Sequence, residues 1–228
     1  MILERLKIIK IKILTREAPG AILRRDDKCR AKGEKGVKLG LVLMAAGAGT
    51  RFGGGKLTAE FRGAPLYRRA LSAVPAGVFE AVAVVSAIAQ LLEEAKAQGF
   101  LPVVNDRPED GVSRTIALGL DALGAVDAAM FLAADQPLLT AKTVKRLAEE
   151  FLAHPTAIVA PAAEGRRGNP CLFPAEFFPA LRALTGDRGG AGIIRANQQR
   201  LRLVEVPPEE LLDADTPEIL AALSQNSR

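Results

Sequence analysis

The sequence contains few of the residues on which many enzyme mechanisms depend. Among its 228 residues are one histidine, two cysteines, one tyrosine and no tryptophan. Cys29 and Cys171 lie far apart and match no metal-ligand spacing, so we expect reduced thiols in a cytoplasmic protein rather than a disulfide framework. His154 directly precedes Pro155 at an expected helix end, which indicates a surface residue. These scarcities argue against histidine-dependent catalysis and against a zinc site.

Long apolar runs and aromatic residues are scarce as well. No run approaches the ~18 apolar residues needed to cross a bilayer, so we expect no membrane partner. The net charge is +5, but twelve of the 31 basic and five of the 26 acidic residues lie in residues 1–38, which leaves the remainder at −2. A nucleic-acid-binding body would carry its own basic face with interleaved aromatics, and aromatics are only 4% here. We therefore expect no nucleic-acid partner.

The charge distribution also suggests how the chain is divided. We expect residues 1–38 to form a basic extension that is disordered or loosely attached. Residues 39–228 lack an internal repeat and a second core, and they predict one α/β domain.

Apolar strand patterns alternate with helical patterns from residue 39 onwards. "LGLVLMAA" (39–46) is a continuous apolar run, as expected of a strand buried on both faces of a parallel sheet. This alternation predicts a three-layer, Rossmann-like domain with a mostly parallel central sheet. The expected strands are 39–46, 80–87, 101–105, 126–135, 157–162, 170–173 and 201–206. The expected helices are 66–74, 88–99, 113–123, one that begins after Thr140, 175–184, 188–199 and 216–223.

The glycine-rich stretch "AAGAGTRFGGGK" (45–56) follows the first expected strand and matches neither common phosphate-binding template. A P-loop would need glycine where Thr50 stands and Ser or Thr where Leu57 stands. A dinucleotide fingerprint would need its third glycine at Phe52. What remains is a wide loop in which glycines let the backbone approach phosphate oxygens and in which Arg51 and Lys56 supply two cations.

Five ordered motifs across residues 39–220 resemble those of single-domain nucleotidyltransferases with a GT-A-like fold, in particular molybdenum cofactor cytidylyltransferases. The motifs are "LMAAGAGTRFGGGKL", "GVSRTIALGL" (111–120), "AADQP" (133–137), "GNP" (168–170) and "GDRGGAG" (186–192), and "DADTPE" (213–218) adds a match near the C-terminus. The resemblance implies transfer of CMP from CTP to the terminal phosphate of molybdopterin, with release of pyrophosphate and dependence on Mg²⁺.

The resemblance also assigns roles to residues of this chain. It implies that Arg51, Lys56 and Asp135 are catalytic, and that Asp135 and Asp215 bind the metal, with Asp213 as the alternative second ligand. Capping of the last helix explains Asp213 and Asp215 almost as well. Ser113 is assigned to the base or ribose, although its position also predicts a helix N-cap. The expected nucleotide-binding residues are Ala45, Ala46, Gly47, Gly49, Arg51, Lys56 and Ser113.

The motifs expected to bind the acceptor match the family's pattern less closely than the motifs expected to bind the nucleotide. The expected acceptor-binding residues are Gly168, Asn169, Pro170, Gly186 and Asp187. The family has an Ala–Arg pair where this chain has Gly190–Ala191–Gly192, so an arginine on the acceptor phosphate is missing or replaced by Arg188 or Arg195.

Three alternatives remain open from the sequence. The guanylyl branch of the same pathway usually has A-G-G where this chain has Ala45–Ala46–Gly47, which favours CTP over GTP. Another small phosphorylated acceptor is the second alternative. The third is a non-catalytic protein that holds the cofactor for a molybdoenzyme or its maturation chaperone.

Overall fold

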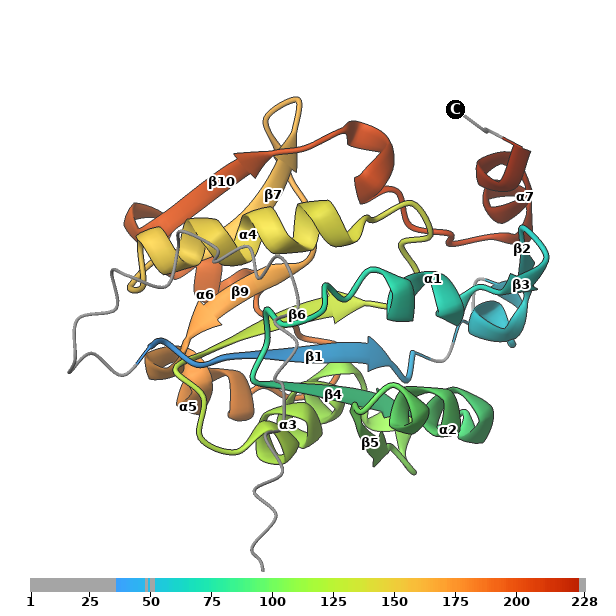
Figure 1. Cartoon of the computed structure of the whole chain (residues 1–228), viewed down its shortest axis with the longest axis horizontal. Helices are drawn as coiled ribbons and strands as arrows, with labels where there is room; N and C mark the ends of the chain where they lie inside the picture. Colours follow the sequence, from blue (N-terminus) through green and yellow to red (C-terminus); the bar gives the residue numbers. More distant parts are fainter. Residues whose placement is uncertain (1–35, 48, 50–51, 226–228) are drawn as a thin grey trace, which may run out of the picture. The chain divides into compact units, whose positions relative to one another are not determined.

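The computed structural model describes residues 36–47, 49 and 52–225 of the chain, and Figure 1 shows their arrangement. Apolar runs in the sequence become strands, and the helices that connect them lie on both faces of the sheet. The strands are β1 (Leu39–Ala45), β2 (Glu60–Phe61), β3 (Ala64–Pro65), β4 (Ala81–Ser86), β5 (Leu101–Val104), β6 (Ala128–Ala133), β7 (Ile158–Ala163), β8 (Arg166–Arg167), β9 (Cys171–Pro174) and β10 (Leu201–Glu205). The helices are α1 (Tyr67–Ser72), α2 (Ala89–Ala97), α3 (Val112–Leu123), α4 (Ala141–Ala153), α5 (Phe178–Arg182), α6 (Ala191–Ala196) and α7 (Pro217–Gln225).

The main sheet has the strand order β10-β7-β9-β6-β1-β4-β5, with β8 paired to β7. Strand β1 runs parallel to both of its neighbours, β4 and β6, and β10 runs parallel to β7. Only β9 and β8 pair antiparallel with their neighbours in this sheet. The predicted α/β fold with a mostly parallel sheet is therefore confirmed.

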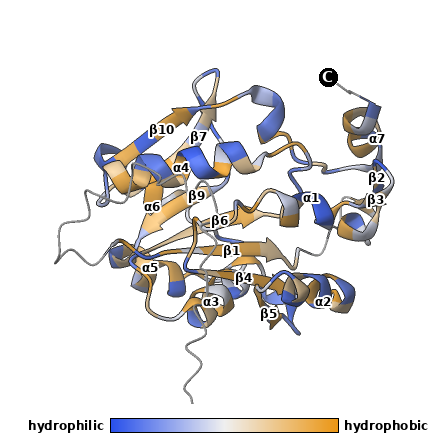
Figure 2. Ribbon diagram, in the orientation of Figure 1, coloured by the Kyte–Doolittle hydropathy of each residue, from blue (hydrophilic) through white to orange (hydrophobic). Residues whose placement is uncertain are grey.

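Successive residues of the central strands enter two separate cores, one on each face of the sheet. In β1, Leu41 and Leu43 pack with helices α1, α2 and α4, whereas Val42 packs with α3, α5 and α6. Figure 2 shows the central strands as mainly hydrophobic, with hydrophilic residues on the helices around them. A Cβ added at Gly119 of α3 would lie 2.3 Å from Cγ1 of Val42, so this glycine allows α3 to pack close against β1.

Two short hairpins and one helix differ from the sequence prediction. The β2–β3 turn contains Arg62 and Gly63, and the β7–β8 turn contains Glu164 and Gly165, all with positive φ. Such turns need few residues, and strands of two residues are too short to show an apolar alternation. The helix expected over 188–199 is limited to α6, and the Nδ2 atom of Asn197 donates to the Ile193 carbonyl where α6 ends.

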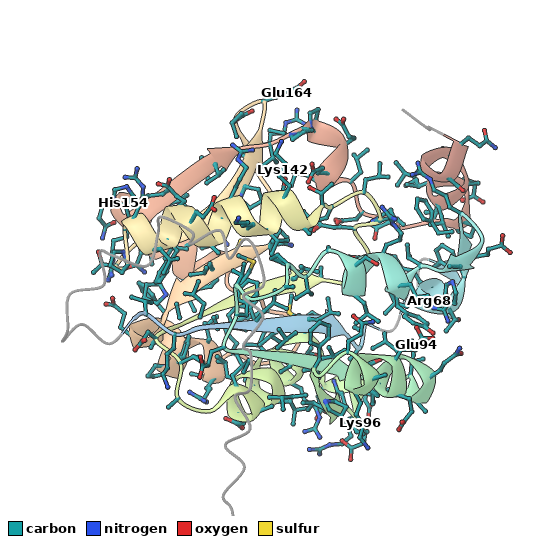
Figure 3. The ribbon with its side chains drawn as sticks, in the orientation of Figure 1. Arg68, Glu94, Lys96, Lys142, His154 and Glu164 are labelled. Atoms are coloured by element: carbon teal, nitrogen blue, oxygen red, sulfur yellow. The ribbon has the colours of Figure 1, made fainter. Side chains whose placement is uncertain are left out.

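The surface residues labelled in Figure 3 lie outside the central sheet. Arg68 of α1 and Glu94 of α2 form a salt bridge of 2.8 Å, and Glu164 lies at the tip of the β7–β8 turn. His154 follows the last residue of α4 and is exposed, as predicted. Within the described residues, no helix is both long enough and apolar enough to cross a membrane.

Candidate active site

Three chain segments meet beyond the carboxyl ends of β1 and β6. The backbone N–H of Ala134 donates to the Met44 carbonyl at 3.0 Å, and the N–H of Ala214 donates to the Asp135 carbonyl at 2.9 Å. Ala214 is fully buried, which anchors the segment before α7 against the end of β6. Ligands of parallel α/β sheets usually bind at this edge.

Lys56 and two aspartates form the charged centre of this region. The Nζ atom of Lys56 donates to Oδ2 of Asp135 at 2.7 Å and to Oδ1 of Asp215 at 3.1 Å. The Lys56 side chain is only 11% exposed, whereas those of Asp135 and Asp215 are 28% and 39% exposed. The sequence analysis predicted that these three residues share one site, and the structure brings them together, although 159 positions separate the first from the last.

The charges of the two aspartates determine the ionisation of Lys56. Burial by itself lowers the pKa of Lys56, but the hydrogen bonds and negative charges of Asp135 and Asp215 outweigh burial and raise the pKa above its ordinary value. Lys56 is therefore a fixed cation at neutral pH. The pKa of Asp213 is also raised, to about 6, but there burial and the charges of Asp135 and Asp215 favour the neutral form of the side chain.

A first cavity of about 490 Å³ opens at this charged centre. Gly49 lies in its wall in a left-handed conformation, with φ of 58°. Arg51, predicted to be catalytic, lies outside the described residues. The lining residues are Met44, Gly47, Gly49, Phe52, Lys56, Leu57, Val112, Ala133, Ala134, Asp135, Asp187 and Asp215.

A smaller cavity of about 200 Å³ adjoins the first, and the two share Gly47, Lys56 and Leu57. Ala45 and Ala46, the residues predicted to face the base, line this smaller cavity rather than the first. The predicted nucleotide-binding residues of the loop are thus divided between two connected spaces.

Ser113 differs from its predicted position. Gly111 occupies the N-cap of α3, so the prediction that Ser113 caps this helix is wrong. The Ser113 N–H donates to the Gly186 carbonyl at 3.1 Å, and Ser113 is buried and lines neither of these two cavities. Gly111 has φ of +84°, and an added Cβ would lie 2.3 Å from the Gly186 carbonyl carbon. This close approach brings Val112 and Asp187 together in the wall of the first cavity.

A second cavity of about 370 Å³ lies next to the first and shares Met44 with it. Two of the predicted acceptor residues, Gly168 and Asn169, line it, and Pro170 follows through a cis peptide bond. The complete lining is Met44, Ile116, Phe131, Gln136, Arg167, Gly168, Asn169, Cys171, Phe173, Leu181, Gly189, Gly190, Ala191, Ile194, Leu211 and Asp213.

The remaining acceptor assignments divide differently from the prediction. Asp187 lines the first cavity, and Gly186 contacts Gly111 instead of lining either large cavity. Neither Arg188 nor Arg195 lines the second cavity, whereas Arg167 does. Arg167 directly precedes the "GNP" motif, which is the signal that could have identified it.

At two places, residues that are close together in the chain line different cavities. Asp135 lines the first cavity and Gln136 the second, and Asp215 lines the first cavity and Asp213 the second. The sequence analysis did not single out Gln136 or Met44, because an apolar or uncharged residue carries no functional signal of its own.

Comparison with known proteins agrees with this architecture. A crystal structure of Rv0371c from Mycobacterium tuberculosis superimposes with a TM-score of 0.70 and 21% identity, covering 84% of this chain and 100% of that one. A nucleotidyl transferase from Methanothermobacter thermautotrophicus gives a TM-score of 0.69 and 21% identity, covering 82% and 96%. A CMP:2-keto-3-deoxy-manno-octonic acid synthetase in complex with CTP gives 0.59 and 16%, covering 82% and 97%. At these identities the likeness shows the fold, which is that of nucleotidyltransferases.

The sequence itself identifies the family. Residues 41–202 match the family described as the MobA-like NTP transferase domain. The chain therefore belongs to this family, and it is a nucleotidyltransferase. No curated protein sequence matches the chain significantly.

Proposed function

We propose that the protein transfers CMP from CTP to the terminal phosphate of a molybdopterin-type pterin and releases pyrophosphate. The observation that carries this proposal is the position of Lys56, which lies between Asp135 and Asp215 in a cavity that shares a wall with a second cavity, where aromatic and aliphatic side chains lie beside polar ones. A cavity that contains a cation suits a triphosphate donor, and a neighbouring cavity that combines aromatic rings with polar groups suits a ring-containing acceptor.

The first cavity is the proposed donor site. Gly47 and Gly49 allow backbone N–H groups to approach phosphate oxygens, and Lys56 supplies a point charge. Arg51 stays a prediction from the sequence, where its guanidinium would share the triphosphate charge.

Asp135 and Asp215 fit a divalent cation. Both carboxylates contact the Nζ atom of Lys56, at 2.7 and 3.1 Å, so they lie close together, and a divalent cation bound to both would lie beside Lys56 or displace its ammonium group. Among the described residues no group of three or more His, Cys, Asp or Glu side chains could hold a metal, which suits Mg²⁺ because it commonly takes one or two carboxylates plus substrate phosphates and water. A related structure of Rv0371c contains manganese. When bound, the ion would neutralise charge on the triphosphate.

The proposed chemistry needs no general base. An oxygen of the acceptor's terminal phosphate monoester attacks the α-phosphorus of CTP. A new oxygen–phosphorus bond forms, the bond from the α-phosphorus to the bridging oxygen breaks, and pyrophosphate leaves with the electron pair. The nucleophile is already anionic at neutral pH, and the chain's only histidine, His154, lines none of the cavities. Catalysis then comes from alignment and charge stabilisation.

The identity of the nucleotide base is the least constrained part of this proposal. Ala45 and Ala46 favour cytosine by resemblance, and GTP is the alternative donor. A pyrophosphate-release assay with pterin cofactor, Mg²⁺ and each nucleoside triphosphate in turn tests the proposal, with Asp135→Asn as the control for contaminating activity. We expect release with CTP only. Release with GTP only would assign the protein to guanylyl transfer, and no release with any nucleotide from folded protein would favour a cofactor-binding role.

A further inference from the structure

Arg167 of β8 places a cation in the wall of the second cavity. The residue is exposed and lines that cavity, whereas the neighbouring Arg166, also exposed, lines none of the three. Successive side chains of a strand point to opposite faces, which accounts for the difference. Among the arginines that the structure describes, Arg167 alone lines any of these cavities.

The guanidinium of Arg167 has no anionic partner within the described part of the chain. Its Nη1 atom donates to Sγ of Cys171 at 3.2 Å, and this sulfur is the only hydrogen-bond or ion-pair partner that the guanidinium has there. Burial raises the pKa of the Cys171 thiol, so the sulfur is neutral at neutral pH and does not cancel the charge of Arg167. A guanidinium carries five N–H donors, and most of those of Arg167 are therefore not used within the protein.

Arginines elsewhere in the fold are bound differently. Arg114 forms a salt bridge with Asp106, and Arg200 forms one with Glu176, so their charges are matched by carboxylates of the chain. The acidic residue of the second cavity, Asp213, makes no such salt bridge with Arg167. The charge of Arg167 is therefore left to be matched by an anion from outside the protein.

The chemistry of this cation favours a phosphate. The planar fork of a guanidinium donates to two oxygens of one phosphate at once, which gives both affinity and orientation. The rings of Phe131 and Phe173 lie in the wall of the same cavity and provide apolar surface for the remainder of the ligand. The second cavity thus suits a ring-containing molecule that carries a phosphate.

The place of Arg167 in the sheet relates this phosphate to the charged centre. Strand β9 begins at Cys171, runs antiparallel to β6 and lies beside the carboxyl end of β6, as Figure 1 shows. The contact with Cys171 therefore holds the guanidinium at the edge of the sheet where Asp135 follows β6. The two cavities at this edge share Met44, so a phosphate on Arg167 lies next to the donor site.

We propose that Arg167 binds the phosphate of the acceptor in the second cavity, with its guanidinium donating to the phosphate oxygens, and thereby selects phosphorylated acceptors. This inference rests on the proposed function in assigning the second cavity to the acceptor. It also supplies the arginine that the family pattern lacks near residue 191, from Arg167 instead of Arg188 or Arg195. Arg167 is a specificity residue in this scheme, and the transfer chemistry remains with the first cavity.

The test is equilibrium binding of three pterins, followed by their fluorescence, to the full-length protein without nucleotide. The ligands are hydroxymethylpterin, its phosphate monoester and carboxypterin, which carries a carboxylate in place of the phosphate. Each is titrated into the wild-type protein, Arg167→Met and Arg167→Lys at one fixed ionic strength, because salt screens exposed charges. Arg166→Met is the matched control, since it removes the neighbouring exposed arginine, which lies outside the cavity lining.

We expect the phosphate ester to bind about tenfold or more tightly than hydroxymethylpterin to the wild-type protein and to Arg166→Met, as for charge-assisted hydrogen bonds. In Arg167→Met this preference should fall below about threefold, because the guanidinium is gone. Arg167→Lys should lie between the two, because it keeps the charge and loses the fork.

A preference for the phosphate ester that is equal in the wild-type protein and Arg167→Met would place the phosphate elsewhere and overturn the inference. The absence of this preference from the wild-type protein, or of pterin binding altogether, would do the same. A gain for carboxypterin as large as that for the phosphate ester, and equally dependent on Arg167, would overturn the selection of phosphate. Melting temperature confirms that Arg167→Met is folded, and Arg167→Lys carries the comparison if it is not.

The outcome separates from that of the proposed function. If the phosphate ester binds with the expected dependence on Arg167 but no nucleotide supports pyrophosphate release, the proposed transfer fails and the phosphate site stands. If pyrophosphate is released but the preference for the phosphate ester is unchanged in Arg167→Met, the transfer stands and the role of Arg167 fails.

Discussion

The two large cavities share one side chain but differ in their chemistry. The first contains a lysine and three aspartates, with Lys56 in contact with two of them. The second combines aliphatic and aromatic side chains with Arg167, Asn169, Asp213 and the buried amide of Gln136. Charge therefore dominates the first cavity, whereas the second combines aromatic and aliphatic surface with polar groups. Substitutions in the first should change the rate of transfer, and substitutions in the second should change which acceptor is used.

The largest effect is expected for Asp135→Asn, which removes one of the two carboxylates on the cation position. We expect turnover to fall by at least about 10³-fold, because charge stabilisation of a transferring phosphoryl group is lost. Pyrophosphate release measures the rate, and circular dichroism checks the fold. Asp121→Asn is the matched control, since Asp121 forms an exposed ion pair with Arg182. Near-normal turnover in Asp135→Asn would remove this residue from the cation position.

Lys56→Met should lower turnover by about 10²–10³-fold and should also make stability depend on divalent cations. Without the ammonium group, the carboxylates of Asp135 and Asp215 lose the positive charge that lies between them, so the melting temperature should fall in EDTA and recover with Mg²⁺ or Mn²⁺ more than in the wild-type protein. Thermal melts with and without the ion provide the measurement. Lys145→Met removes an exposed lysine that pairs with Glu149, and this control should show no such dependence. A variant of Lys56 that is indifferent to divalent cations would argue against the convergence of the two carboxylates.

Gly111→Ala should disturb the wall of the first cavity through the backbone. The positive φ and the overlap of a Cβ with Gly186 together are expected to cost about 2–4 kcal/mol of unfolding free energy. Gly77→Ala separates the two causes, because Gly77 also has positive φ, 71°, but an added Cβ there meets nothing within 4 Å. Urea denaturation of both variants gives the comparison. Equal losses would mean that the contact with Gly186 contributes nothing beyond conformation.

The smallest effect is expected in the second cavity, from Gly190→Ala. An added Cβ would lie 2.6 Å from Cζ of Phe173, whereas one at neighbouring Gly189 would meet nothing within 4 Å. We expect Gly190→Ala to raise the KM for the acceptor by about threefold to tenfold as Phe173 shifts, with the KM for the nucleotide unchanged. Gly189→Ala should leave both constants near their wild-type values. A change in the KM for the nucleotide would show that the two cavities are not functionally separate.

The fold was largely predictable because its strands are apolar and buried on both faces. The runs around Leu41, Met130 and Val159 are long enough to show strands, and the helices between them have clear apolar faces. The two hairpins were missed because each depends on a positive-φ residue before glycine, Arg62 in one and Glu164 in the other. Neither residue is typical of such turns.

The charged part of the site was predictable for a similar reason. Asp135 ends an apolar run, and a charged side chain in that position signals a function on its own. Asp187 was predicted to bind the acceptor, and it lines the first cavity; its place there depends on the contact between Gly111 and Gly186, which no local pattern encodes. Gln136 and Met44 acquire their significance only from the cavities that they line.

The shared wall at Met44 has a consequence for how the two substrates affect each other's binding. An unbranched thioether with three rotatable bonds can change its shape easily, and Met44 borders both cavities. Any movement of this side chain that one substrate induces alters the space available to the other. The two affinities are then thermodynamically linked, and a nucleotide that favours binding of the acceptor must be favoured by the acceptor to the same degree.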